Sequence, residues 1–128
     1  MLEGIVTAFI GGVAAESGKV ATKAVADSFR ALKELLVRKL GDKSEAAVAL
    51  TKLEDKPDSD GRKATLAEEL KDAKVEDDPE LVQAARRLQA ALDQLPTESR
   101  AHVQHAVGNY IAQASGGSTA TVNVNKPS

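Results

Sequence analysis

The sequence has 128 residues, a length typical of one domain. Its 17 basic and 19 acidic residues give a formal charge of −2, which argues against a general nucleic-acid binder, because such proteins carry a basic excess. The chain has no cysteine, which excludes disulfides and thiolate chemistry, and with 2% aromatic residues its core must consist mainly of Leu, Val, Ile and Ala.

The N-terminal segment is the most distinctive part of the sequence. Residues 4–15 contain no charged side chain, and we predict a helix over residues 2–17. Gly4, Ala8 and Gly12 recur every four residues, so on a helix they form one stripe of small side chains. Such a stripe lets a second helix approach closely and is typical of helices that pack in membranes. The larger apolar side chains of the segment are Ile5, Val6, Phe9, Ile10 and Val13.

This segment differs from both a targeting peptide and a standard membrane span. Glu3 is the only charge before the apolar run, whereas a signal peptide begins with a basic region. The twelve uncharged residues are also fewer than the roughly 20 that span a bilayer. We therefore expect a cytoplasmic start and a central bundle helix, apolar all round because it is buried all round. That structural role does not exclude a second role after the helix is released.

A second helix is predicted over residues 19–40, after a break at Gly18 and before Gly41, which occupies the position of a C-terminal cap. Its apolar residues follow the helical spacing: Val25, Phe29, Leu32, Leu36 and Leu40. Six basic and two acidic residues give this helix a local charge of +4. The simpler interpretation is a solvated face. The alternative is attraction to anionic lipid head groups, worth about 1 kcal/mol for each charge.

Two short helices are expected next. Ser44 is suited to the N-cap of the third helix. The composition of residues 56–61 predicts a turn, and the fourth helix follows it with Ser59 or Asp60 as its cap.

The start of a fifth helix is the clearest boundary in the sequence. Asp78 is a favoured capping residue, and Pro79 is favoured at the first helical position. Apolar residues then follow at heptad-like spacing: Leu81, Ala85, Leu88, Leu92 and Leu95. This helix could pack inside the bundle or form a coiled-coil contact with a partner. The first is favoured because short helices need mutual cover, and Pro96 ends the helix.

The C-terminal part differs in kind from the rest. Residues 97–100 indicate a new helix start, and whether that helix reaches residue 114 stays open. We predict an all-α bundle of about five helices over residues 1–108, followed by a flexible or β-forming tail over residues 109–128.

The tail prediction rests on a change of period. Residues 115–118 indicate a flexible turn, and residues 119–125 alternate between apolar and polar side chains as a strand does. Residues 110–114 could supply a partner strand. Uncharged segments of this kind can stack between chains into cross-β structure. The alternative interpretation is that the tail is frayed and forms no strand.

No catalytic constellation is present in the sequence. Glu98, His102 and His105 could face one side of a helix, but a fourth metal ligand and a recognised spacing are lacking. Phosphate-loop and calcium-loop motifs are absent. We therefore expect neither an enzyme nor a cofactor or metal site.

An apolar small-residue helix, a charged Ala/Leu-rich bundle and a β-prone tail occur here in this order. The order resembles the Bell domains of multicellular bacteria, which are similar to the fungal HeLo and HeLo-like domains. The resemblance is carried by residues 24–36, 78–81 and 111–124. The tail departs from the best-known motif type, because it lacks an (Ile/Val)-Gln-(Ile/Val)-Gly core.

The resemblance implies a membrane-targeting cell-death effector of a bacterial immunity-like system, cytoplasmic at rest and membrane-associated when activated. The implied partners are further copies of the chain, an NLR-like receptor with a matching motif, and anionic membrane lipids. Nucleic acid is not expected as a partner, because of the charge balance. The implied membrane-active helix contains Gly4, Ile5, Val6, Ala8, Phe9, Ile10, Gly12 and Val13. The implied self-assembly tail contains Ile111, Gln113, Ala120, Val122, Asn123, Val124 and Asn125. The alternative function is a non-enzymatic helical adaptor that recruits another protein.

Overall fold

The structure is a computed structural model that describes the backbone of residues 2–119 and the side chains of residues 2–108 and 110. The described chain is helical throughout and contains no strand, which confirms the all-α prediction. It has six α-helices rather than about five, because the segment from Thr97 forms a full helix. The elements are α1 Leu2–Ser17, α2 Lys23–Leu40, α3 Glu45–Asp55, α4 Asp60–Asp72, the 3-10 helix η1 Val75–Asp77, α5 Pro79–Asp93 and α6 Thr97–Thr119.

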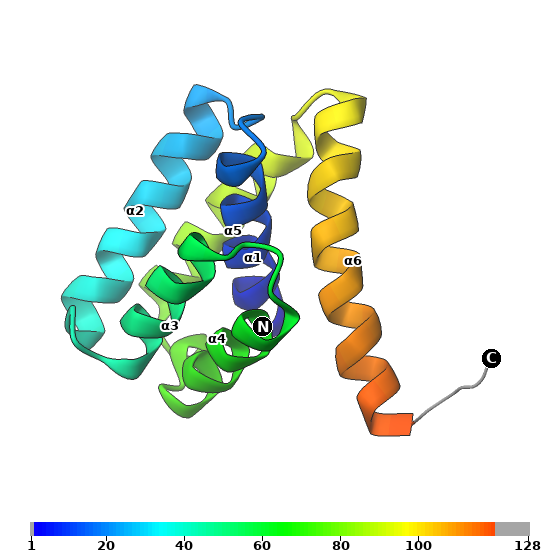
Figure 1. The fold of residues 1–128 in the computed structure, drawn as a ribbon. Helices are drawn as coiled ribbons and strands as arrows, with labels where there is room; N and C mark the ends of the chain where they lie inside the picture. The colour runs from blue at the N-terminus through cyan, green and yellow to red at the C-terminus, as the bar shows by residue number, and fades with distance from the viewer. Residues whose placement is uncertain (1, 120–128) are drawn as a thin grey trace.

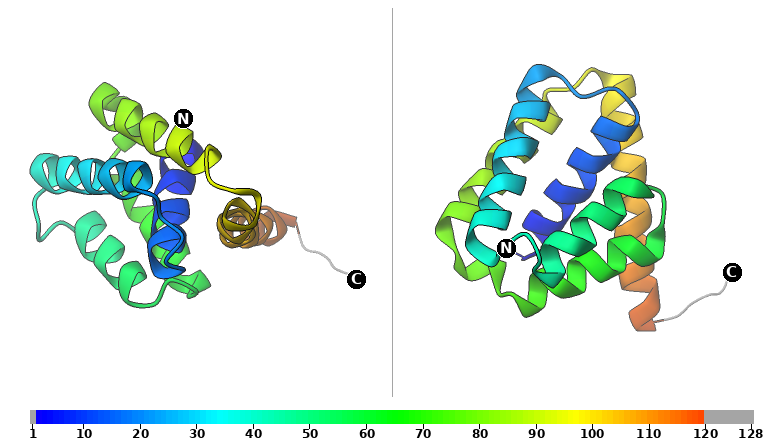
Figure 2. Two further views of the ribbon diagram at one scale, coloured as in Figure 1. Left: turned by 90° about the horizontal axis from the view of Figure 1, so that it is seen from above. Right: turned by 60° about the vertical axis from the view of Figure 1, so that its left-hand side comes forward.

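The N-terminal helix α1 is the centre of the bundle (Figure 1). It packs against each of the other five α-helices and against η1. Helices α2 and α5 pack extensively on each other, as do α3 and α4, whereas α5 and α6 contact α1 far more than each other. The view from above shows α6 standing apart from α5 and α2, with α1 between them (Figure 2). The core of the protein is therefore built around α1.

The helix starts follow from capping side chains. The hydroxyls of Thr22, Ser44 and Ser59 accept hydrogen bonds from backbone N–H groups in the first turns of α2, α3 and α4. Asp78 caps α5 in the same way, ahead of Pro79. The predictions at Ser44 and Asp78 are confirmed, and Ser59 rather than the next residue caps α4. Helix α2 begins at residue 23 rather than 19 because Thr22 is its cap.

The break after α1 has a different origin from the one predicted. Lys19, not Gly18, adopts the left-handed conformation, with φ 58°. The N–H of Val20 donates to the carbonyl of Ala15 at 2.9 Å, and the N–H of Lys19 donates to that of Glu16 at 3.2 Å. This pair of bonds is the Schellman arrangement that closes many helices.

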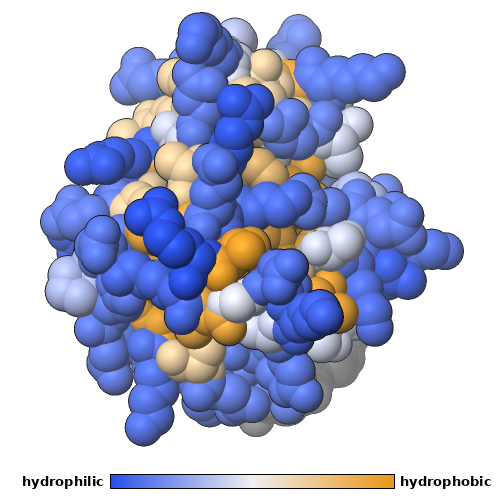
Figure 3. All heavy atoms as spheres, turned by 90° about the vertical axis from the view of Figure 1, so that its left-hand side faces the viewer, coloured by the Kyte–Doolittle hydropathy of each residue, from blue (hydrophilic) through white to orange (hydrophobic). Residues whose placement is uncertain are grey.

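The face of the molecule on the α2 side is largely hydrophilic (Figure 3). Charged and polar side chains cover most of the face on the α2 side, with apolar residues showing between them (Figure 3). Among the described residues, Val48 is the one large apolar side chain that is exposed, at 41%. The one charged side chain buried in the described part of the chain is Lys63, at 3% exposure.

Helix α6 continues past the predicted boundary between bundle and tail. Residues 109–119 are helical, so the turn predicted at residues 115–118 lies within α6. Residues 120–128 lie outside the described part of the chain. The division into residues 1–108 and 109–128 stays a prediction.

Candidate functional site

The candidate site is α1 together with the side chains that cover it. Helix α1 is apolar over most of its surface, and ten of its sixteen residues are buried. Of the predicted membrane-active residues, only Gly4 is exposed. The buried ones are Ile5, Val6, Ala8, Phe9, Ile10, Gly12 and Val13. The structure thus places the predicted membrane-active segment inside the core.

The predicted small-residue stripe is divided between the core and the surface. A Cβ built at Gly12 would lie 2.5 Å from Cδ1 of Phe29 and 3.2 Å from Cδ2 of Leu88. A Cβ built at Gly4 would meet nothing within 4 Å. Gly12 therefore lets α2 and α5 approach α1 closely, whereas Gly4 faces open space.

Gly11, one residue before Gly12, permits a second close approach. A Cβ built at Gly11 would lie 2.8 Å from Cδ1 of Leu92, 3.2 Å from Cγ1 of Val103 and 3.7 Å from Cγ2 of Val107. Leu92 comes from α5 and the two valines from α6. Gly11 is thus the point at which α5 and α6 both reach the α1 backbone.

Helix α6 also contacts α1 near both of its ends. Nε2 of His102 lies 3.3 Å from the carbonyl oxygen of Ala14, and the His102 ring leaves no room for a side chain at Gly18. A side chain at position 18 would therefore displace the His102 ring. Near the other end, burial and the Glu3 carboxylate raise the pKa of the Tyr110 hydroxyl above its usual value.

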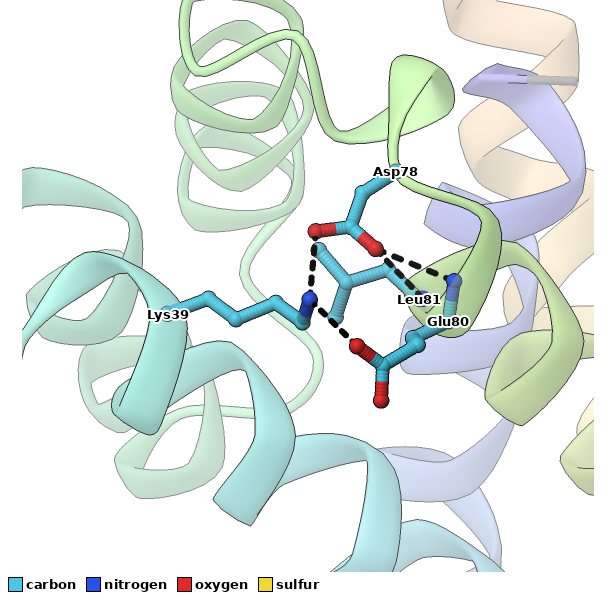
Figure 4. Close-up of polar contacts among 4 residues, drawn as sticks. All are labelled: Lys39, Asp78, Glu80 and Leu81. Carbon is cyan, nitrogen blue, oxygen red and sulfur yellow. Dashed lines mark hydrogen bonds and ion pairs between the residues drawn. The ribbon is translucent and has the colours of Figure 1, made fainter.

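An ion-pair cluster joins the end of α2 to the start of α5 (Figure 4). Nζ of Lys39 lies 2.9 Å from Oδ2 of Asp78 and 2.8 Å from Oε1 of Glu80. The other carboxylate oxygen of Asp78 accepts hydrogen bonds from the N–H groups of Glu80 and Leu81. The hydrogen bond from Lys39 lowers the pKa of Asp78, while hydrogen bonds to Glu80 and Asp78 raise the pKa of Lys39. The cluster therefore links α2 to α5, two of the helices that cover α1.

A buried lysine, Lys63, joins α4 to α6. Its Nζ donates a hydrogen bond of 3.2 Å to the carbonyl of Ala106 and lies 3.9 Å from Oδ1 of Asp60. Sequence reasoning missed this residue because lysine is normally read as surface. The available clue was its spacing, since Lys63 lies three and seven residues before the buried Leu66 and Leu70.

The basic residues of α2 are partly neutralised. Lys23 pairs with Asp27 at 2.8 Å within the helix, and Lys33 pairs with Glu54 of α3, also at 2.8 Å. With the Lys39 cluster, three of the six basic residues predicted in the second helix have carboxylate partners. These pairs favour the interpretation of a solvated face.

Metal-binding geometry is not found in the described part of the chain. No group of three or more His, Cys, Asp or Glu side chains there could hold an ion, and His102 instead contacts the α1 backbone. Nor does any described helix combine the length and the apolar character needed to cross a membrane.

The predicted self-assembly residues are divided between α6 and the part of the chain that is not described. Ile111 and Gln113 lie in the helical part of the chain, within α6. The other five, Ala120, Val122, Asn123, Val124 and Asn125, lie outside the described residues.

Comparison with known proteins supports one part of the resemblance. A search of curated proteins and a search of solved structures gave no match. A family model, described as the Het-E N-terminal domain, matches residues 2–128. This HeLo-like family is related to cell death. The chain therefore belongs to the Het-E N-terminal domain family, a HeLo-related group of helical domains.

Proposed function

We propose that this protein is a membrane-targeting cell-death effector whose membrane-active element is α1. The observation that carries the proposal is the position of α1, an apolar helix held inside a bundle whose other helices have polar outer faces. A helix that is apolar on nearly all sides is stable only when covered by protein or by lipid. The cell-death-related family supports the same conclusion.

The length of α1 limits how it could enter a membrane. Sixteen residues make a helix about 24 Å long, against a hydrocarbon core of about 30 Å. Insertion would need a thinned bilayer, extension of the helix past Glu16, or several helices packed together. The Gly4, Ala8 and Gly12 stripe would let released helices pack closely.

The trigger in this proposal is self-assembly through residues 111–125, templated by an NLR-like receptor that carries a matching motif. Bringing chains together raises the local concentration of α1 and favours its joint release into anionic membranes. The setting is that of a bacterial Bell domain, cytoplasmic at rest and membrane-associated when activated.

A reversible crosslink between α1 and α6 tests whether α1 must leave the bundle. The Cβ position of Gly11 lies 3.2 Å from Cγ1 of Val103. The double variant Gly11→Cys/Val103→Cys therefore brings the two sulfur atoms close enough to test for a disulfide. Because the same Cβ position lies 2.8 Å from Cδ1 of Leu92, this side chain must shift, and circular dichroism has to show that each cysteine variant is folded. Because the natural chain has no cysteine, the background is free of competing thiols.

The readout is dye release from anionic liposomes by the full-length chain after assembly, which light scattering follows. We expect the oxidised double variant to assemble without leakage and to cause leakage once reduced. Each single cysteine variant is the control and should leak in both conditions. Leakage by the oxidised protein would refute release of α1. An assembled, reduced protein that never leaks would instead favour the helical adaptor.

A further inference from the structure

A single hollow of about 470 Å³ lies where the start of α1, the end of α4 and the middle of α6 meet. These three helices all contact one another. On α1 and on α4 the lining residues recur one turn apart, so each helix presents one side to the hollow, and α6 adds Tyr110. We call this feature the Tyr110 hollow.

Half of the lining of the Tyr110 hollow is apolar. Val6 is fully buried, whereas the other apolar lining residues are half-buried and so keep accessible surface. This surface can cover the hydrocarbon part of a ligand. The apolar lining residues are Leu2, Val6, Ala67 and Tyr110.

The charged lining of the hollow is mainly negative. Glu3 of α1 and Glu68 and Asp72 of α4 contribute three carboxylates, against one ammonium group from Lys71. All four of these residues are exposed. Within the described part of the chain none of them forms an ion pair, so the protein leaves the carboxylates without a cation.

Two neighbouring groups respond to this negative charge. Partial burial, the Glu45 carboxylate and then Asp72 and Glu68 raise the pKa of Glu69 above its usual value. Glu3 adds to the effect of burial in raising the pKa of Tyr110. Both shifts have the sign expected near negative charge that no cation neutralises.

We propose that the Tyr110 hollow binds an aliphatic polyamine, with its ammonium groups at the carboxylates and its methylene groups on the apolar lining. Glu68 and Asp72 are four residues apart, so their Cβ atoms lie about 6 Å apart on one side of α4, and Glu3 belongs to a different helix. In the described part of the chain no three acidic side chains are close enough to hold one metal ion. Carboxylates spread in this way suit several linked charges better than one small ion. The site does not depend on the membrane activity proposed above.

The first test is calorimetric titration of the full-length protein with spermidine at low ionic strength, where screening is weak. We expect one spermidine to bind to each chain and to raise the midpoint of thermal unfolding, because the hollow exists only in the folded state. Hexaamminecobalt(III) has the same charge and N–H donors but no methylene groups. It should bind at least about tenfold more weakly, the difference that two buried methylene groups provide.

Charge variants at exposed positions locate the ammonium sites. Glu68→Gln/Asp72→Asn should weaken spermidine binding by about fivefold to tenfold. Asp42→Asn/Asp58→Asn changes the net charge equally at exposed positions outside the hollow and should have much less effect.

Removing the cation of the hollow should act in the opposite direction. Lys71→Gln takes away the repulsion between Lys71 and the ligand and should tighten spermidine binding by about twofold to fivefold. Lys43→Gln, at an exposed position outside the hollow, is the control and should change the affinity less.

A steric variant tests the hollow itself. Ala67→Phe places a ring in the hollow and should abolish spermidine binding. Ala64→Phe introduces the same ring at an exposed position of α4 outside the hollow and should leave binding unchanged. Circular dichroism shows whether both variants are folded, and the charge variants test the site even if Ala67→Phe is not.

Several results would overturn the proposal. One is the absence of spermidine binding to the folded natural protein, as would occur if the tail or a second copy filled the hollow. Another is equal affinity for spermidine and hexaamminecobalt(III), which would show general attraction of cations without a role for the apolar lining. A third is equal loss of affinity in Glu68→Gln/Asp72→Asn and in its control. None of these results would bear on liposome leakage.

Discussion

Gly12 of α1 and Phe29 of α2 lie so close together that the structure has no room for a methyl group at position 12. A Cβ at position 12 would lie 2.5 Å from Cδ1 and 3.1 Å from Cε1 of the Phe29 ring. Real Cβ atoms do not approach another atom this closely, so a larger residue at position 12 would force the ring and α2 to move. The buried ring has little room to move, because protein cores are close-packed.

This relationship predicts opposite effects of one substitution at two glycines of the same helix. Gly12→Ala should destabilise the protein by about 1–3 kcal/mol through overpacking. Gly4→Ala, where the new methyl meets open space, should stabilise it by about 0.5 kcal/mol because alanine favours the helix. Denaturant unfolding followed by circular dichroism measures both changes. Equal effects at the two positions would contradict the packing described for Gly12.

Because Lys63 is buried, removing its charge and removing its aliphatic side chain should change the free energy of unfolding by different amounts. Lys63→Met keeps the aliphatic volume and removes a buried charge, so the free energy of unfolding should stay within about 1 kcal/mol of the natural protein. Lys63→Ala removes the packed stem as well and should cost about 2–4 kcal/mol. If methionine were as destabilising as alanine in denaturant unfolding, the hydrogen bond to Ala106 would be the dominant contribution.

The Lys39–Asp78 pair predicts how stability depends on pH. Because the pKa of Asp78 is lower in the folded state than its usual 3.8, the pair's contribution is fully present above pH 3.8. It is lost as the pH falls through the folded-state pKa. Hydrogen bonds to Glu80 and to Asp78 raise the pKa of Lys39 above 10.5, so the contribution of these contacts is also complete below pH 10.5 and is lost as the pH rises through the folded-state pKa.

The measurement is the difference in free energy of unfolding between the natural protein and Lys39→Gln at several pH values. This difference should be constant between the two limits and should shrink towards zero in acid. Lys43→Gln is the control, since Lys43 has no ion-pair partner among the described residues. A difference that persisted after Asp78 is protonated would show that Lys39 contributes through packing rather than charge.

A charge at Thr7 of α1 should separate membrane activity from folding. Thr7 is only half-buried, so Thr7→Asp should leave the bundle folded. In the released helix the same charge would lie in the apolar segment, where an aspartate costs up to about 3 kcal/mol in a membrane. We expect the Thr7→Asp variant to cause much less liposome leakage than the natural protein. The Thr65→Asp variant, with its charge on α4, should cause as much leakage as the natural protein. Undiminished leakage would mean that this part of α1 does not enter lipid.

The tail prediction is tested by charges on its apolar positions. Val122→Lys/Val124→Lys should prevent assembly of the full-length chain, because lysine disfavours stacked strand edges. Val122→Ile/Val124→Ile keeps the alternation and should assemble as the natural chain does. Light scattering over time measures the difference. Normal assembly of the lysine variant would place the self-association surface elsewhere.

Local chemistry was sufficient to predict the helical class and several helix limits. Ser44 and the Asp78–Pro79 pair are capping residues whose effect reaches only a few positions, so their roles were predicted correctly from neighbouring residues alone. The unbroken apolar character of residues 4–15 likewise predicted a helix buried on nearly all sides. The limit of α6 was harder, because glycine and serine at residues 115–118 favour a turn while the structure continues the helix to Thr119.

Tertiary structure decided which side chains meet. The sequence by itself determined that α1 is apolar and that small residues recur along it, but only the packing shows that Phe29 covers Gly12 while Gly4 stays open. Packing also decided that Lys63 is buried, at the contact between α4 and α6. The physical reason is that apolar spacing specifies which face of a helix avoids water. It does not specify which of the other helices will cover that face, since burial of apolar surface is non-directional.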